Sequence, residues 1–247
     1  MPATRQIDVY LLPDLAQQAD LAGSVAVVID VLRATTTIVH ALAAGATEVI
    51  PCLEIVDAFA HRQSLGDRAL LGGERSGILI PGFDLGNSPA EYTADRVRGK
   101  TIIFTSTNGT RALARCREAS RVLLGAFVNF SALCRELAAE QRISIVCAGT
   151  DRHVTREDTL LAGALVDDLS RSKRCQLNDQ AEIAADAWRS AVRFLTDRPL
   201  GMTLRASRGG RNLIETGQEN DIDLAAQMDK FDVVPQMDLA TRHLRVP

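Results

Sequence analysis

Short runs of consecutive apolar residues, not alternating with polar ones, recur along the chain and are bounded by turn residues. Such runs are typical of strands buried on both faces, as in a parallel sheet. The sequence therefore predicts strands over Val25–Ile29, Glu48–Pro51, Ala69–Leu71, Thr101–Phe104, Arg121–Leu124, Ile143–Val146 and Asp232–Val234.

Between these runs, apolar residues recur at three- and four-residue spacing, which predicts amphipathic helices. The predicted helices cover Thr36–Ala44, Val56–Ser64, Thr110–Ala119, Phe130–Glu140, Glu157–Ser170 and Asp179–Leu195, with shorter ones over Ala90–Tyr92 and Ile222–Met228. Because strands and helices alternate, we expect a three-layer α/β/α fold with a mostly parallel or mixed central sheet.

No linker rich in Pro, Gly or Ser divides the chain, so we expect a single α/β domain over residues 1–247. Residues 171–211 are mostly helical in pattern and lack strand signals. We interpret them as a helical insertion or cap on the sheet.

The composition excludes several classes of protein. A net charge of −3 with interspersed signs gives no field that would attract nucleic acid. No basic leader or apolar run of about 18 residues is present, so we expect a cytoplasmic protein without a membrane span. The five cysteines are scattered and odd in number, which argues against a disulfide framework or a zinc knot. Cys147, at a predicted strand end, is the only thiol considered as a nucleophile.

Polar residues follow three of the predicted strands directly, at positions 30–35, 105–111 and 148–151. In open α/β sheets, ligands bind outside the carboxyl ends of the strands. We therefore expect these three clusters to converge on one ligand site.

The cluster after the strand ending at Phe104 has the parts of an oxyanion cradle: hydroxyls, an amide, a glycine and an arginine before a helix. An ordinary strand-to-helix turn with a solvated arginine is the alternative interpretation. The residues concerned are Ser106, Thr107, Asn108, Gly109, Thr110 and Arg111.

Asp30 ends one buried strand, and Arg33 follows three residues later. A carboxylate there suits Mg²⁺, which takes one or two carboxylates together with water and phosphate oxygens. The planar guanidinium of Arg33 would then bind the phosphoryl group. The alternative is that Asp30 caps a helix and Arg33 makes a surface ion pair.

Two glycine-dense loops, at 72–77 and 82–89, carry the candidate residues Glu74, Asp84 and Asn87. Such loops let the backbone approach a ligand, although plain turn chemistry also explains them. Neither loop has a Walker A sequence.

Glu157 and Asp158 are adjacent at the start of an apolar helix. Acids there complement the helix dipole, yet two together after a polar strand end also fit metal ligation or general-base catalysis. The four histidines are isolated and show no HxH or HExxH spacing, which argues against a zinc catalyst. His153 is a candidate donor to a leaving oxygen, or an exposed loop residue.

Taken together, these segments resemble the 2-phosphosulfolactate phosphatase family. The segments that carry the resemblance are VVIDVLRATTTIVHALAAGATEVIP (27–51), GERSGILIPGFDLGNSPAEYT (73–93), GKTIIFTSTNGTRAL (99–113), GAFVNFSAL (125–133) and CAGTDRHVTREDTLLAGALVDDL (147–169). A weaker likeness runs from 211–213 through 221–222 to 234–235.

The resemblance implies a Mg²⁺-dependent phosphatase that converts 2-phospho-3-sulfolactate to 3-sulfolactate and phosphate, a step towards coenzyme M in methanogens. It also implies an α/β fold distinct from the familiar phosphatase superfamilies, and a homodimer. Carried over by motif, the site residues are Asp30, Arg33, Glu74, Asp84, Asn87, Asn108 to Arg111, Glu157 and Asp158.

The chain departs from the family pattern at two places. Ser106 stands where threonine is expected, and Gly209 and Gly210 stand where a histidine-glycine pair is usual. The second departure removes a side chain that would bear on substrate preference.

The leading hypothesis is hydrolysis of a phosphomonoester by direct attack of water, since no DxDxT signature surrounds Asp30. Asp30, with Glu157 or Asp158 and with Glu74, would hold Mg²⁺, while Arg33 and residues 107–111 would bind phosphoryl oxygens. The rival is a non-catalytic protein that holds an organic phosphate or sulfonate in the same cradle.

Overall fold

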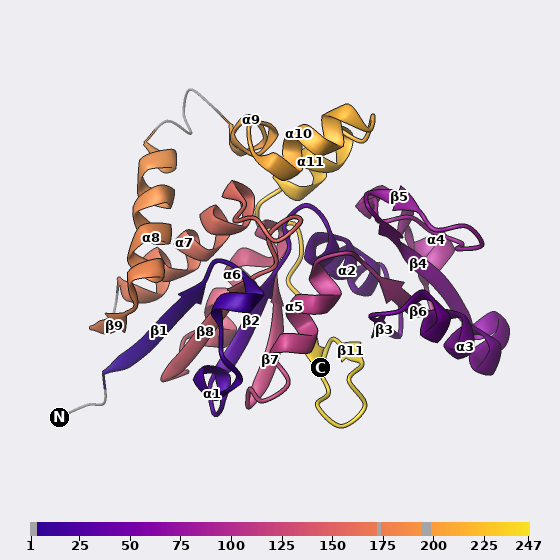
Figure 1. The fold of residues 1–247 in the computed structure, drawn as a ribbon, viewed down its shortest axis with the longest axis horizontal. Coiled ribbons are helices and arrows are strands. Elements are labelled where there is room, and N and C mark those ends of the chain that lie inside the picture. Colours follow the sequence, from indigo (N-terminus) through magenta and orange to yellow (C-terminus); the bar gives the residue numbers. More distant parts are fainter. Residues whose placement is uncertain (1–3, 172–173, 194–198) are drawn as a thin grey trace.

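The computed structural model describes residues 4–171, 174–193 and 199–247. Its centre is an eleven-stranded sheet with the order β5-β4-β6-β3-β11-β10-β7-β2-β8-β1-β9 (Figure 1). Pairs that involve β5, β10 or β11 run antiparallel, and the other neighbouring pairs run parallel. The expected α/β fold with a mixed, mostly parallel sheet is confirmed. The strands are β1 Arg5–Tyr10, β2 Val25–Ile29, β3 Glu48–Cys52, β4 Ala69–Arg75, β5 Ile78–Leu79, β6 Thr101–Thr105, β7 Arg121–Gly125, β8 Arg142–Cys147, β9 Cys175–Leu177, β10 Gln236–Met237 and β11 Leu244–Arg245.

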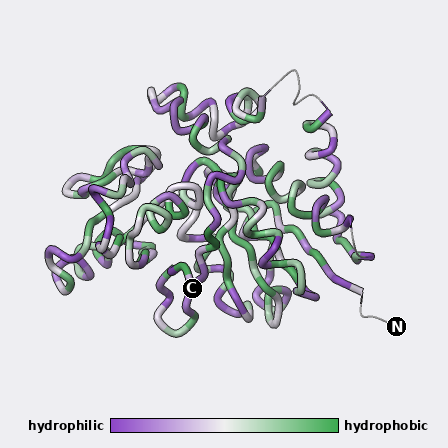
Figure 2. Tube along the Cα trace, turned by 180° about the vertical axis from the view of Figure 1, so that it is seen from behind, coloured by the Kyte–Doolittle hydropathy of each residue, from purple (hydrophilic) through white to green (hydrophobic). Residues whose placement is uncertain are grey.

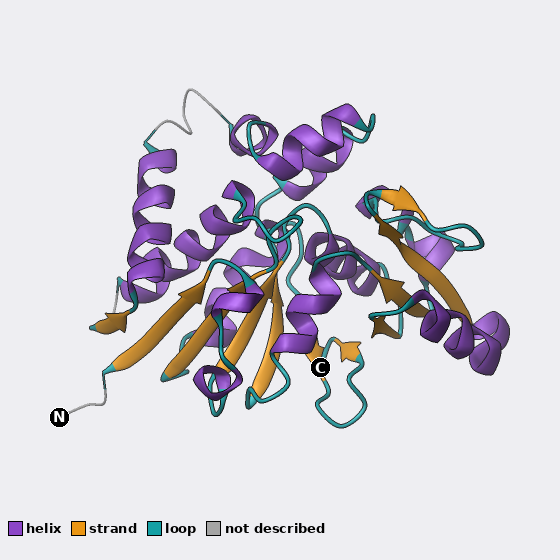
Figure 3. Ribbon diagram, viewed as in Figure 1, coloured by secondary structure: helices purple, strands orange, loops and turns teal. Residues whose placement is uncertain are grey.

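Helices flank this sheet (Figure 3), and their apolar side chains form separate cores with it. Leu133 of α6, Leu161 of α7 and Trp188 of α8 belong to one core, whereas Ile38 of α2 and Ala112 of α5 belong to another. The α-helices are α1 Gln18–Leu21, α2 Ala34–Ala43, α3 Ile55–Leu65, α4 Ala94–Val97, α5 Gly109–Arg115, α6 Phe130–Leu137, α7 Arg156–Ser170, α8 Asp179–Val192, α9 Leu200–Arg205, α10 Arg208–Glu215 and α11 Asn220–Ala225. Short 3₁₀ helices are η1 Pro13–Leu15, η2 Gly66–Arg68, η3 Pro89–Glu91 and η4 Phe127–Asn129.

Six of the predicted strands coincide with β2, β3, β4, β6, β7 and β8. Much of the length of the central strands consists of hydrophobic residues (Figure 2). The predicted strand at Asp232–Val234 is wrong, because residues 231–235 have no strand structure and β10 begins at Gln236. That apolar run instead packs beside the core, with Val233 against Val39 and Val128. Apolar content alone did not distinguish a half-buried loop from a strand.

Sequence reasoning missed β1 because its polar residues Arg5, Gln6 and Asp8 interrupt the apolar pattern. In the sheet, the guanidinium of Arg5 is buried, and its Nε donates to the carbonyl of Glu140 at 2.9 Å. Two further carbonyls, of Ala138 and Leu169, accept from the same side chain. These partners compensate for the loss of water around the charge.

The predicted helical segment 171–211 contains a strand as well as helices. β9 pairs in parallel with β1, α8 packs against α7, and α9 and α10 lie beyond the upper end of the sheet in Figure 1. Residues 172, 173 and 194–198 of this segment, including the predicted helix end at Leu195, lie outside the described residues.

The hairpin of β10 and β11 joins two groups of parallel strands. Met237 of β10 pairs with Val122 of β7, and Leu244 of β11 pairs with Val49 of β3. The group β4-β6-β3 thereby becomes continuous with the group β7-β2-β8-β1-β9.

Within the described residues, none of the helices has the length and hydropathy required to cross a bilayer.

His40 is a buried residue of α2 whose ring meets Phe231 edge-on, with 4.8 Å between the ring centroids. Its Nε2 atom has no hydrogen-bond partner among the described residues. Burial lowers the pKa of His40 from 6.5 to about 4, and the positive charge of Lys230 acts in the same direction.

Between pH 6.5 and 4, the unfolded chain therefore binds a proton at His40 that the folded chain does not bind. The contribution of His40 to stability falls as the pH drops through this window. We predict that His40→Leu makes the unfolding midpoint less dependent on pH between 6.5 and 4, measured by thermal unfolding in a series of buffers. Parallel curves for the variant and the unchanged protein would contradict this account.

Candidate active site

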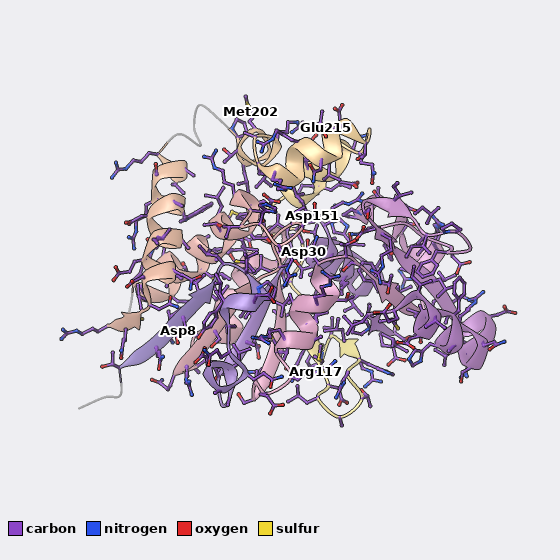
Figure 4. All side chains as sticks on the ribbon, viewed as in Figure 1. Asp8, Asp30, Arg117, Asp151, Met202 and Glu215 are labelled. Atoms are coloured by element: carbon purple, nitrogen blue, oxygen red, sulfur yellow. The ribbon has the colours of Figure 1, made fainter. Side chains whose placement is uncertain are left out.

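A cavity of about 330 Å³ lies at the carboxyl ends of the parallel strands. The loops after β2, β4, β6 and β8 line it together with α10, and in Figure 4 Asp30 and Asp151 lie close together below Glu215. The predicted residues in its wall are Asp30, Arg33, Glu74, Asn87, Thr107 and Asn108. The three polar clusters predicted to converge therefore contribute to one cavity.

Asp30 is buried where β2 ends, and its Oδ1 accepts a hydrogen bond from the N–H of Ala34 at 3.3 Å. Burial raises the pKa of Asp30 to about 7; the Ala34 N–H lowers it, while the negative charges of Glu74 and Glu157 raise it further. A Cβ atom at Gly109 would lie 2.9 Å from Oδ2 of Asp30. The same Cβ would lie 2.6 Å from the Cβ of Ala34, so glycine at the start of α5 permits close approach to the start of α2 as well as to this carboxylate.

Arg33 is buried, and its Nη1 donates to Oδ2 of Asp221 at 2.6 Å and to Oε1 of Gln218. Oδ1 of Asp221 accepts from the hydroxyl of Ser88 at 2.5 Å. The ion pair with Asp221 holds the guanidinium in the cavity wall. Moving Arg33 away would leave the buried carboxylate of Asp221 without its partner charge, which costs free energy. Sequence reasoning missed Asp221, which appeared only within the weak tail likeness.

Glu157 lies at the start of α7 and contacts the start of α10. Its Oε1 accepts from the N–H of Gly209 at 3.2 Å, and a Cβ atom at Gly209 would lie 2.1 Å from this oxygen. Its Oε2 is buried and has no hydrogen-bond partner in the described parts of the chain. Burial raises the pKa of Glu157, with backbone N–H groups and Ser207 opposing the shift. Glycine at position 209 therefore lets α10 meet this carboxylate.

In Asp158 and in Glu74, both carboxylate oxygens accept hydrogen bonds from backbone N–H groups of neighbouring loops. Asp158 accepts from the N–H groups of Val31 and Gly149, each at 2.9 Å, and so ties the loops after β2 and β8 together. Burial raises the pKa of Asp158, as do the nearby charges of Glu157 and Asp30.

Glu74 plays the same part on the other side of the cavity. It accepts from the N–H of Thr107 at 2.7 Å, the N–H of Gly77 at 2.7 Å and the hydroxyl of Thr107 at 3.0 Å. The Thr107 hydroxyl also accepts from the N–H of Ser76 at 3.1 Å. Glu74 thus holds the backbone at Thr107 in place, and Asn108 is the next residue along the chain.

The remaining predicted residues occupy different surroundings. Ser106 and Thr110 are buried and bond to each other: Ser106 Oγ accepts from Thr110 N at 3.1 Å, and Thr110 Oγ1 donates to Ser106 O at 2.8 Å. Asn87 is buried, with its Oδ1 unpaired within the described residues. Asp84 is exposed and accepts from the N–H of Leu71 at 2.8 Å, outside the cavity.

Arg111 does not line this cavity but a neighbouring one. Cys147 is buried in the apolar core, and burial raises the pKa of its thiol well above the usual value, so it is unsuited to be a nucleophile. His153 is an exposed loop residue whose Nδ1 lies 2.8 Å from the carbonyl oxygen of Asp151.

Among the described residues, no three His, Cys, Asp or Glu side chains are grouped so that they could hold a metal ion. Magnesium requires less than this, since one or two carboxylates suffice when water and phosphate supply the other ligands. Asp30, in the cavity wall, fits this sparse set. Glu157 lies behind the wall, against Gly209, and its Oε2 is unpaired within the described residues. Glu74 and Asp158 do not fit the set, because backbone donors occupy both of their oxygens.

Comparison with known proteins gives the family. Residues 10–239 match the family model described as 2-phosphosulpholactate phosphatase. The chain belongs to the 2-phosphosulfolactate phosphatase family. This family was the one indicated by the sequence motifs.

Three curated relatives, each named "Probable 2-phosphosulfolactate phosphatase", match over most of their length. The relative from Symbiobacterium thermophilum is 45% identical over 219 residues, which cover 87% of this chain and 92% of the relative. That from Carboxydothermus hydrogenoformans is 39% identical, with 94% and 92% covered. That from Deinococcus radiodurans is 40% identical, with 94% and 93% covered.

The loop-holding role of Asp158 can be tested by Asp158→Asn. The amide NH₂ group cannot accept a hydrogen bond, so one buried N–H, of Val31 or Gly149, loses its partner. We expect the free energy of unfolding to fall by about 1–3 kcal/mol in denaturant titrations. The control Asp186→Asn, at a side chain that is 78% exposed on α8, should change it by less than about 0.5 kcal/mol. Equal effects of the two substitutions would show that Asp158 does not hold these loops.

Proposed function

We propose that this protein hydrolyses 2-phospho-3-sulfolactate, or a related 2-phospho acid, to the 2-hydroxy acid and inorganic phosphate, with Mg²⁺ bound. Family membership supports the substrate class. The observation that carries the proposal is the single cavity in which Asp30, Arg33 and Asn108 meet. It combines a buried acid with a fixed cation and an amide donor, an arrangement that suits electrostatic stabilisation of phosphoryl transfer.

In this proposal Asp30 and Glu157 hold the metal. When bound, Mg²⁺ would polarise the phosphoryl group and favour attack by water. Glu157 Oε2 has no hydrogen-bond partner within the described residues, which supports its assignment as a ligand.

Arg33 binds the phosphoryl oxygens and neutralises the charge that develops on them. A guanidinium has five N–H donors, and the hydrogen bonds found for this side chain among the described residues all come from Nη1. Nε and Nη2 thus remain for the substrate. The ion pair with Asp221 holds the group in position before substrate binds, so little reorganisation accompanies the reaction.

Asn108 and Asn87 provide neutral contacts. Both line the cavity, and neither amide group forms a side-chain hydrogen bond among the described residues. Thr107 acts indirectly, because its hydroxyl is already bonded to Glu74. We assign the phosphoryl contacts of this segment to Asn108 and the supporting role to Thr107.

Asp30→Asn should reduce kcat for phosphate release by about a hundredfold or more, since the variant loses the charge that holds the metal. A chelator should abolish turnover by the unchanged protein, and added Mg²⁺ should restore it. The control Asp186→Asn should retain full turnover, and thermal unfolding should verify that Asp30→Asn folds. Undiminished turnover of Asp30→Asn would refute its role. Metal-independent binding of 2-phospho acids without any turnover would favour the non-catalytic alternative.

Gly209→Ala tests the contact between α10 and Glu157. Alanine is favourable in a helix, but its Cβ would displace the Glu157 carboxylate. We expect phosphate release to fall about tenfold or more while the unfolding temperature changes little. Gly201→Ala in α9 is the matched control, because its Cβ would meet only the ends of the Asp223 and Arg205 side chains and the Ala226 methyl group. If both variants keep full turnover, the position of Glu157 is not set by this contact.

A further inference from the structure

A second cavity, of about 330 Å³, lies at the same edge of the sheet. Three segments form it: the turn at η1, the first turn of α5 and the loop after β8. Their charged residues are Asp14, Arg111 and Arg152 respectively.

The two cavities share parts of their walls. Asn108 lines both of them, and the consecutive residues Asp151 and Arg152 line the main and the second cavity respectively. The two cavities therefore adjoin at Asn108 and at the loop of residues 151–152.

The second cavity has an excess of positive charge. Within the described residues, the guanidinium of Arg111 forms neither a hydrogen bond nor an ion pair. Arg152 pairs with Asp14 at 2.9 Å, but the two side chains are 78% and 66% exposed, so this pair is weak and readily exchanged. The hydrogen bond and the charge of Arg152, and less strongly the charges of Arg115 and Arg111, hold the pKa of Asp14 below its usual range. Two guanidinium groups thus face one carboxylate.

We propose that Arg111 and Arg152 form a subsite that binds the sulfonate of the substrate while its phosphoryl group occupies the main cavity. This inference rests on the proposed function, and it names the residues that would distinguish a sulfonated substrate from one without a sulfonate. Guanidinium groups match the oxygens of such an anion with paired N–H donors. Arg111 then selects the substrate instead of contacting the phosphoryl group, the role that the sequence suggested.

The test compares two substrates, 2-phospho-3-sulfolactate and 2-phospholactate, which lacks the sulfonate. In Arg111→Gln and Arg152→Gln, kcat/KM for the sulfonated substrate should fall about tenfold or more beyond any fall for 2-phospholactate, chiefly through KM. Arg111→Lys should restore part of the difference. Arg117→Gln, at an exposed arginine just beyond α5 and outside both cavities, is the control and should change neither value.

Equal losses on both substrates, or no loss, would overturn the subsite and leave the proposed function standing. If the unchanged protein turns over neither substrate, the proposed function fails, and calorimetric binding of 3-sulfolactate still decides the subsite. Weaker binding by Arg111→Gln than by Arg117→Gln would support it. Binding that is absent from the unchanged protein, or equal in the two variants, would overturn it.

Discussion

The free-energy cost of burying carboxylates at one edge of an apolar sheet determines how this site is built. Asp158 and Glu74 meet that cost with hydrogen bonds from backbone N–H groups, and in doing so they hold four loops together. Asp30 and Glu157 receive fewer hydrogen bonds: within the described residues one N–H, of Ala34, reaches the Asp30 carboxylate, and Oε2 of Glu157 has no partner. The acids that stabilise the site are therefore distinct from those that remain available for chemistry.

Two glycines make this arrangement possible from opposite sides. Gly109 brings the start of α5 to Asp30, and Gly209 brings the start of α10 to Glu157. At each position a methyl group would occupy the space of a carboxylate oxygen or its immediate neighbours. Glycine at position 209 thus has a structural meaning, because the backbone itself contacts the acid there.

The sequence predicts those parts of the fold and site that depend on local patterns. Continuous apolar runs located the central parallel strands, and the rule that their carboxyl ends share one edge brought Asp30, Glu74 and Asn108 together. The contributions of Asp221 and α10 depend on packing between distant helices, which no local pattern specifies. Likewise, whether a carboxylate faces backbone donors, as Asp158 does, or lacks a partner, as Glu157 Oε2 does, follows only from the tertiary structure.

The position of the β10–β11 hairpin late in the chain determines when the central sheet can become continuous. Glu74 lies in β4 and Thr107 just after β6, on one side of this hairpin, whereas Asp30 follows β2 and Asp158 lies in α7, after β8, on the other side. Residues 236–245 follow all four along the chain. During translation, both groups of strands emerge from the ribosome before the segment that bridges them, so a continuous sheet beneath the cavity forms only after that late segment is synthesised.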